Sequence, residues 1–363
     1  MMNKQRFLSQ FKNPKTYLHI LYRVSLFLLA LLLFVFALML MKESAQPLAP
    51  MIRGTFSVDS AASALGLGWL TASLALSGSP VAASALSLLD AKVLSPHESF
   101  AMISGSRLGA SMVVLIVGFT YMLRGKDRNV SLGVGLTSLL VTQTLYPLVL
   151  AIGFFLLNLP WLKSIDFGAA QGFHAPLNSL FEPLVSFLKV NLPPGLLLLI
   201  GFLFTILSLW VFDRVIPDLN LKQSNVGQIN QLVYRPLVTF MLGALITSMT
   251  MSVSVSLSLL VPLSVRGFVR LENIIPYILG ANITTFIDTL LAAVLLANPA
   301  GMTVVVVMIV SVMLASLCIL LFGYRSYERL VQRLAYWIGS RRITLAGYLL
   351  LIIGLPFLLL WIG

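Results

Sequence analysis

Residues 68–80, GWLTASLALSGSP, and residues 243–255, GALITSMTMSVSV, repeat one pattern of glycine and serine within apolar sequence. An offset of 175 residues (243 minus 68) aligns the two segments without a gap. The same offset extends over residues 58–123 and 233–298, and each copy interrupts its apolar sequence at the same two places. Matching interruptions in two halves of a membrane protein are typical of the binding site of a transporter.

The composition of the chain is that of a membrane protein. Apolar residues make up 58% and charged residues 10% of the sequence, and the mean hydropathy is +0.97. Apolar stretches of about 18 residues or more are long enough to cross a bilayer as helices. Uninterrupted spans of this kind are predicted at 24–41, 130–157, 195–212, 300–322 and 344–362.

Charged residues between the spans orient the chain in the membrane. Segment 1–23 is basic, loop 323–343 carries five arginines against Glu328, and the short loop 124–129 is also basic. Because basic loops stay in the cytoplasm, these three segments are predicted to be cytoplasmic, and the balanced connection 159–194 is predicted to be external. The formal net charge of +12 therefore reflects orientation and not a nucleic-acid partner.

With these constraints, the two copies cross the membrane in opposite directions. The predicted fold is an all-α polytopic membrane protein with two inverted repeats, each with a re-entrant hairpin and an unwound transmembrane helix. We expect it in the cell membrane, with its N-terminus in the cytoplasm. Its predicted parts are a cytoplasmic basic segment (1–23), the first inverted repeat (24–158), an external connection (159–194), the second inverted repeat (195–333), and a cytoplasmic linker with a final transmembrane helix (334–363).

The first interruption in each copy predicts the re-entrant hairpin. Residues 58–76 are helix-like, Ser77-Gly78-Ser79-Pro80 follows, and the chain resumes as the 12-residue run 80–91. As a helix this run extends about 18 Å, which is too short to cross about 30 Å of hydrocarbon. Glycine permits a tight turn there, and proline favours the first turn of a helix. Ser252-Val253-Ser254 forms the tip of the second predicted hairpin, and residues 255–264 follow it.

The second interruption covers residues 104–111 in the first copy and 279–286 in the second. It is predicted to unwind one membrane crossing, and unwound backbone at membrane depth is tolerated where it lines a cavity. Four short helices, starting at 80, 108, 255 and 283, are therefore expected to converge near the middle of the membrane. Their N-terminal N–H groups favour a negative charge, which indicates a site for a small oxyanion.

Two motifs resemble those of the sodium-dependent phosphate symporters, whose inverted repeats each carry a Gln-Ser-Ser-Ser hairpin tip and a Gly-Ala-Asn-Ile-Gly-Thr-Thr break. Residues 280–285, GANITT, resemble the break, and Ser77-Gly78-Ser79 and Ser252-Val253-Ser254 resemble the tips. The resemblance spans both repeats, about 300 residues. It implies a phosphate-type substrate contacted by hairpin serines, and sodium held by serine and threonine hydroxyls, unwound carbonyls and the Asn282 amide.

Departures from the family pattern change the charge of the predicted site. Leu76 and Met251 replace the tip glutamines, and Arg107 replaces the asparagine of the first repeat. An arginine in the middle of a membrane costs about 2.5–3.5 kcal/mol on insertion scales, so it is retained where it pairs or functions. Arg107 is predicted to grip the oxyanion or to replace a bound cation, with structural pairing as the alternative. Asp288 is either its partner or a ligand of the coupling ion.

The sequence thus predicts a secondary transporter for phosphate or a similar oxyanion, coupled to sodium or protons, with no catalytic residue and no cofactor other than sodium. Its predicted partners are the small anion and the lipid bilayer, and the oligomeric state stays open. The alternative is a membrane-embedded enzyme or lipid-phosphate-handling protein on the same scaffold. The predicted substrate-binding residues are Ser77, Gly78, Ser79, Arg107, Ser252, Ser254, Asn282 and Thr285, and the predicted coupling-ion residues are Ser254, Asn282, Thr284 and Asp288.

Overall fold

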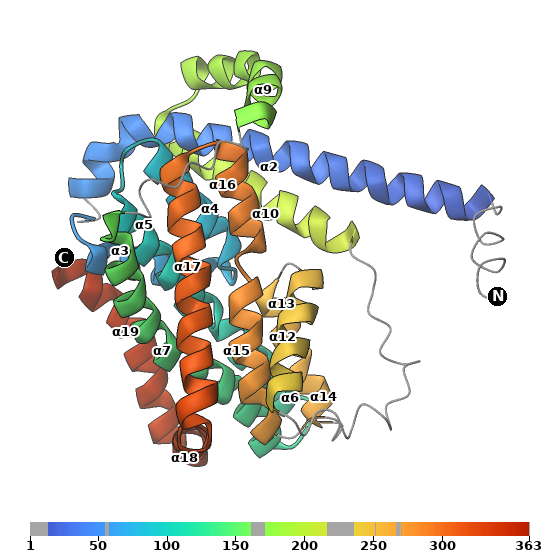
Figure 1. Ribbon diagram of the computed structural model, residues 1–363, viewed down its shortest axis with the longest axis vertical. Helices are drawn as coiled ribbons and strands as arrows, with labels where there is room; N and C mark the ends of the chain where they lie inside the picture. Colours follow the sequence, from blue (N-terminus) through green and yellow to red (C-terminus); the bar gives the residue numbers. More distant parts are fainter. Residues whose placement is uncertain are drawn as a thin grey trace.

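A computed structural model describes residues 14–54, 58–160, 171–215, 236–250, 252–265, 269 and 271–362 of the chain (Figure 1). These residues form helices and no strand, which confirms the all-α prediction for the described part. Within these described ranges, seven helical segments are long and apolar enough to cross a membrane, and each of the five predicted spans falls on one of them. The seven are Leu21–Met51, Pro96–Leu123, Arg128–Leu157, Pro194–Val211, Ile274–Leu296, Pro299–Ser340 and Arg342–Ile362.

Two short helices, α3 (Ala61–Ala75) and α4 (Ser79–Asp90), meet at the predicted tip of the first hairpin. Ser60 caps α3, because its side chain accepts a hydrogen bond from the backbone N–H of Ser63 at 3.1 Å. α3 ends at Leu76, whose φ of 52° lies in the left-handed region that reverses the chain. Both helices lie where the sequence predicted them.

The second half of the chain has a similar arrangement in α12 (Pro236–Thr250), α13 (Val253–Ser258) and α14 (Leu260–Val265). Ser252 caps α13, and its Oγ accepts a hydrogen bond from the Val255 backbone N–H at 3.3 Å. The return run therefore starts at Val253, two residues before the predicted start at 255, and it is divided between α13 and α14.

The second interruption of the first copy is shorter than predicted and lies later in the sequence. α5 (Pro96–Ala110) is helical through residues 104–110, and the chain turns at Ser111 before α6 (Met112–Leu123). The Ser111 backbone N–H still donates to the Arg107 carbonyl at 3.1 Å. The predicted unwinding over 104–111 is therefore wrong, and the second helix starts at 112 instead of 108.

The second copy differs from its prediction in the same way. α15 (Ile274–Thr284) is helical where unwinding was predicted, and the turn at Thr285 and Phe286 precedes α16 (Ile287–Leu296). The predicted helix start at 283 is therefore wrong by four residues (287 minus 283).

Close helix packing explains why the glycines at these positions do not unwind the helices. A Cβ atom on Gly105 would collide with the carbonyl of Leu65, and one on Gly280 would collide with the carbonyl of Phe240. Small residues let two membrane helices approach closely, so these glycines join α5 to α3 and α15 to α12. Two further contacts repeat at the 175-residue offset: Gly68 with Met102, and Gly243 with Tyr277.

The long helix α7 (Arg128–Leu157) contacts both copies of the repeat. Gly153, near its C-terminus, faces the ring of Phe100 in the first turns of α5. Gly133, near its N-terminus, faces Leu271 in the 3₁₀ turn η2 (Leu271–Asn273) that precedes α15. α5 and α15 therefore begin at opposite ends of α7.

The last helices are α17 (Pro299–Cys318), α18 (Tyr324–Ser340) and α19 (Arg342–Ile362), and the π-helical turn η3 (Ile319–Gly323) joins α17 to α18. Arg128 Nη2 donates to the Gly339 carbonyl at 3.3 Å. The basic loops 124–129 and 323–343 therefore lie at the same end of α7, as their common charge predicted.

α2 (Pro14–Gly54) and α10 (Pro194–Val215) pack side by side and lie across the other helices in Figure 1. Ser208 Oγ donates to the Ala30 carbonyl at 2.7 Å, and Gly201 faces Met41 further along α2. Residue numbers rise along one helix as they fall along the other, so the pair is antiparallel.

The predicted external connection contains a helix that the sequence analysis did not predict. α9 (Gln171–Asn191) packs against α2 and α10 through Val185, which forms a small buried cluster with Phe36 and Leu197. Leu184 and Phe187 on α9 stay exposed, and Lys189 pairs with Glu43 of α2 at 2.7 Å.

Candidate functional site

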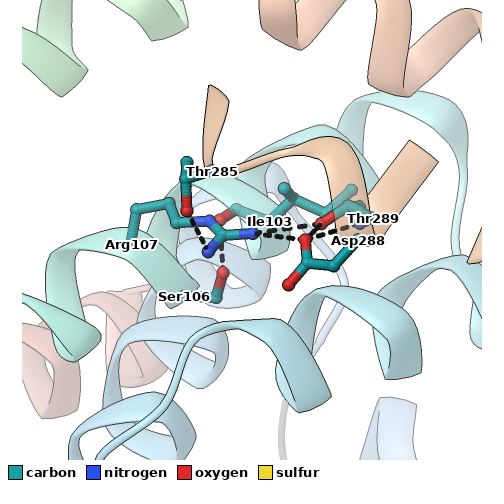
Figure 2. A network of polar contacts seen from close by, with 6 residues as sticks. All are labelled: Ile103, Ser106, Arg107, Thr285, Asp288 and Thr289. Carbon is teal, nitrogen blue, oxygen red and sulfur yellow. Dashed lines mark hydrogen bonds and ion pairs between the residues drawn. The ribbon is translucent and has the colours of Figure 1, made fainter. Parts of the chain in front are cut away.

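Arg107 forms the centre of the candidate site, in the last turn of α5 (Figure 2). Its side chain is only 3% exposed. Nη1 donates to Thr285 Oγ1 at 2.9 Å, and Nη2 donates to Thr289 Oγ1 at 3.0 Å. The first acceptor lies in the turn between α15 and α16 and the second in α16, so Arg107 links the two copies.

Asp288 lies beside this guanidinium but does not form a close ion pair with it. Its Oδ1 is 3.8 Å from Arg107 Nη2, beyond hydrogen-bond distance. The same oxygen accepts hydrogen bonds from the backbone N–H of Thr289 at 2.6 Å and from its hydroxyl at 3.0 Å. Thr289 therefore bridges the buried acid and the buried base.

The buried charges are incompletely hydrogen-bonded. An arginine side chain has five N–H donors, and two of those of Arg107 are used in the described part of the chain. Arg107 Nε and Asp288 Oδ2 are both buried and have no hydrogen-bond partner among the described residues. The Phe286 ring, centred 4.6 Å from Arg107 Cζ, adds a cation–π contact. The site can therefore accept further hydrogen-bonding groups, and those that complement Arg107 are anionic.

The tip of the first hairpin touches Arg107. A Cβ atom on Gly78 would lie 2.9 Å from the Ser106 carbonyl and 3.4 Å from Arg107 Nη1, so glycine permits this approach. Ser77 and Ser79 flank Gly78 and are partly exposed, and within the described residues their hydroxyls have no hydrogen-bond partner. The structure thus brings the first tip to Arg107.

Tyr146 of α7 is a further polar residue near the site, which the sequence analysis missed. Its side chain is fully buried, and its hydroxyl has no partner in the described part. Thr289 and Phe286 were also not among the predicted site residues. A signal for Thr289 was present, because Thr285, Asp288 and Thr289 are spaced three and four residues apart on one face of a helical segment.

The second hairpin tip has a different polar environment. The Ser252 hydroxyl serves as the cap of α13. Thr247 Oγ1 donates to Ser256 Oγ at 2.7 Å, and Ser256 Oγ is 2.8 Å from the Tyr277 hydroxyl. The Ser254 hydroxyl has no partner among the described residues, and no hydrogen bond there joins Ser252 or Ser254 to Arg107.

Asn282 and Thr284 donate to helix carbonyls instead of to the site centre. The Asn282 amide donates to the Ile278 carbonyl at 2.8 Å, within α15. Thr284 Oγ1 donates to the Ala244 carbonyl of α12 at 2.8 Å. In the first copy, Gly109 corresponds to Thr284 and Trp69 corresponds to Ala244. Gly109 packs closely against the Trp69 carbonyl, so a glycine contact stands where the second copy has the Thr284 hydrogen bond.

Among the described residues, no cluster of three or more His, Cys, Asp or Glu could hold a metal ion. No protein-family model, no curated protein and no solved structure matches this chain.

Proposed function

We propose that this protein is a secondary transporter for phosphate or a similar small oxyanion, working by alternating access. The observation that carries this proposal is a buried arginine whose Nε has no partner among the described residues, beside Gly78, which lies between two partly exposed serines of the predicted tip. A guanidinium binds tetrahedral oxyanions with paired hydrogen bonds, and a buried charge lacking such partners is costly. An oxyanion at Arg107 would supply the missing acceptors.

The proposed architecture is a pair of inverted repeats, each with a re-entrant hairpin. Repeated glycine contacts at the 175-residue offset support the repeat, and the opposite starting points of α5 and α15 along α7 support its inversion. The lengths of α3 and α4 support a hairpin that enters and leaves on one side, because 12 residues in α4 extend only about 18 Å.

Arg107 explains how binding could act on both halves. It extends from the first repeat to Thr285 and Thr289 of the second, so an anion that draws on its donors changes a contact between the repeats. The N-terminus of α4 follows Gly78, which lies beside Arg107, and its backbone N–H groups are additional donors. Alternating access requires that substrate binding change the contacts between the two repeats, because one repeat moves against the other around the site.

The coupling ion is proposed to be a proton or sodium. Asp288 has one oxygen without a partner, and this oxygen can take a proton. Sodium is disfavoured beside Arg107, because two like charges 4 Å apart repel by about 4 kcal/mol at an effective dielectric constant of about 20. We therefore propose weaker sodium dependence than in the family that the sequence resembles.

The alternative function is an enzyme or lipid-phosphate-handling protein. The observation that favours it is the Thr289 hydroxyl 3.0 Å from Asp288 Oδ1, because a hydroxyl beside a carboxylate can act as a nucleophile. The same hydroxyl also accepts a hydrogen bond from Arg107 Nη2, which favours a role for Thr289 in positioning the Arg107 side chain. Release of inorganic phosphate from phosphatidic acid by the purified protein would support the alternative over transport.

We expect Ser77→Ala and Ser254→Ala each to weaken phosphate binding roughly ten- to hundredfold, because a hydrogen bond to a charged group contributes about 1.5–3 kcal/mol. Isothermal titration of phosphate into the purified protein measures the affinity. Ser73→Ala and Ser248→Ala are matched controls at the repeat offset, because both hydroxyls donate within their own helices, to Trp69 and Leu245. Equal losses at all four positions would mean that the tip serines pack and do not bind.

We expect positions 126 and 340 to face the cytoplasm and position 191 to face outward. Lys126→Cys, Ser340→Cys and Asn191→Cys, each in a Cys318→Ala background, are treated in intact cells with a membrane-impermeant maleimide. Labelling of position 191 alone is expected, with the other two labelled after permeabilisation. Labelling of all three from one side would contradict the proposed threading.

A further inference from the structure

A cavity lies between α7 and α18, at the end of α7 opposite to the start of α5. Its volume is about 230 Å³, several times the roughly 30 Å³ that one water molecule occupies in the liquid. Its lining includes both polar and apolar residues. Those that matter here are the polar Arg128, Asn129 and Gln332, the apolar Leu132 and Leu136, and Tyr336.

Arg128 is the cationic group in this wall. Its Nη2 donates to the Gly339 carbonyl at 3.3 Å, and its Nε is buried without a partner among the described residues. The neighbouring Asp127 forms no ion pair with it among the described residues, and its Oδ1 instead caps α7 by accepting from the backbone N–H groups of Asn129 and Val130. Arg128 therefore retains donors for an anionic ligand.

The surroundings of the cavity are basic. Arg124 and Lys126 precede Arg128, and Arg333, Arg341 and Arg342 are exposed on and after α18. Glu328 is the acid of α18, and Gln332 donates to it at 3.4 Å. An excess of arginine and lysine next to an apolar wall is the pattern that binds anionic lipid headgroups.

α18 itself is suited to lie at a membrane surface. Val331, Ala335 and Ile338 on one face are buried against the protein, while Tyr336 and Trp337 are 75% and 62% exposed. Tyrosine and tryptophan are enriched where a membrane meets water. The cavity mouth therefore lies at the depth where phospholipid headgroups are found.

We propose that this cavity binds an anionic phospholipid, with its phosphate at Arg128 and the first part of an acyl chain along Leu132 and Leu136. The combination of unused guanidinium donors, basic surroundings and an apolar wall favours a lipid over a free anion, which would use only the polar side. This site is separate from Arg107 and does not depend on the transport proposal.

Native mass spectrometry of the full-length protein in detergent tests this site with dioleoylphosphatidylglycerol, dioleoylphosphatidylcholine and glycerol 3-phosphate as probes. We expect the wild-type protein to retain phosphatidylglycerol at least tenfold better than phosphatidylcholine. Arg128→Gln should lose this preference, and Arg124→Gln, at an exposed position of the same loop, should keep it. Glycerol 3-phosphate should not displace the lipid.

Ser340→Trp gives a second variant, because it fills the mouth of the cavity from an exposed position without changing Arg128. It should lower phosphatidylglycerol retention as much as Arg128→Gln does. Unchanged lipid preference in both variants would overturn the proposal. Displacement by glycerol 3-phosphate would also overturn it, since the cavity would then bind small anions and not lipids.

Discussion

Arg107→Asn is expected to weaken phosphate binding roughly ten- to hundredfold. The substitution removes a buried guanidinium that lies beside Gly78 and whose Nε has no partner among the described residues, and a hydrogen bond to a charged group contributes about 1.5–3 kcal/mol. Arg107→Lys should rescue binding poorly, because an ammonium keeps the charge but loses the planar fork that matches an oxyanion. Isothermal titration of phosphate with each purified variant measures the effect.

The asparagine variant also tests the link between this charge and sodium. Removing the positive charge removes the repulsion of a nearby cation, so Arg107→Asn should make phosphate uptake more dependent on sodium. Unchanged phosphate affinity in Arg107→Asn, together with strict sodium dependence of the wild-type protein, would assign Arg107 a structural role only.

Arg107→Leu and Asp288→Leu are each expected to destabilise the protein by about 3–5 kcal/mol, because each leaves one buried charge without its partner. The double variant should be much less destabilised than the sum of the two, since it leaves no buried charge. Unfolding of the purified proteins in mixed detergent and denaturant measures all four free energies of a double-mutant cycle. Additive losses would show that the two charges do not interact.

Phosphate binding separates the structural and functional roles of this pair. The double variant should fold but fail to bind phosphate, because the described residues include no other buried lysine or arginine. A double variant that binds phosphate like the wild-type protein would remove the basis for placing the substrate at Arg107.

The sequence predicted helix positions well wherever they depended on composition or on a local turn signal. The five spans follow from apolar length, and the turn between α3 and α4 follows from Ser77-Gly78-Ser79-Pro80, whose conformational preferences are local. The breaks at Ser111 and at Thr285–Phe286 lie at the ends of the predicted interruptions 104–111 and 279–286, whose other residues stay helical. Gly105 and Gly280 were interpreted as helix breakers. Instead they allow close packing against carbonyls of α3 and α12, which are distant in sequence and cannot be identified from the local pattern.

The candidate site was predictable in part for the same reason. Arg107 and Asp288 stand out as charges in apolar sequence, and the structure brings them to 3.8 Å of each other. Sequence spacing places Thr289 on the same helix face as Thr285 and Asp288, but its hydrogen bond with Arg107 depends on how α16 packs against α5. Asn282 and Thr284 belong to the motif that resembles the phosphate symporters. In the structure, however, Asn282 donates to a carbonyl of α15 and Thr284 donates to a carbonyl of α12.

Uptake of labelled phosphate into sealed proteoliposomes tests the central claim most directly. Transport predicts saturable, time-dependent accumulation above protein-free liposomes when an inward proton or sodium gradient is imposed, and its loss in Arg107→Asn. Accumulation no greater than in protein-free liposomes, with a folded protein and under both gradients, would contradict phosphate transport through this site.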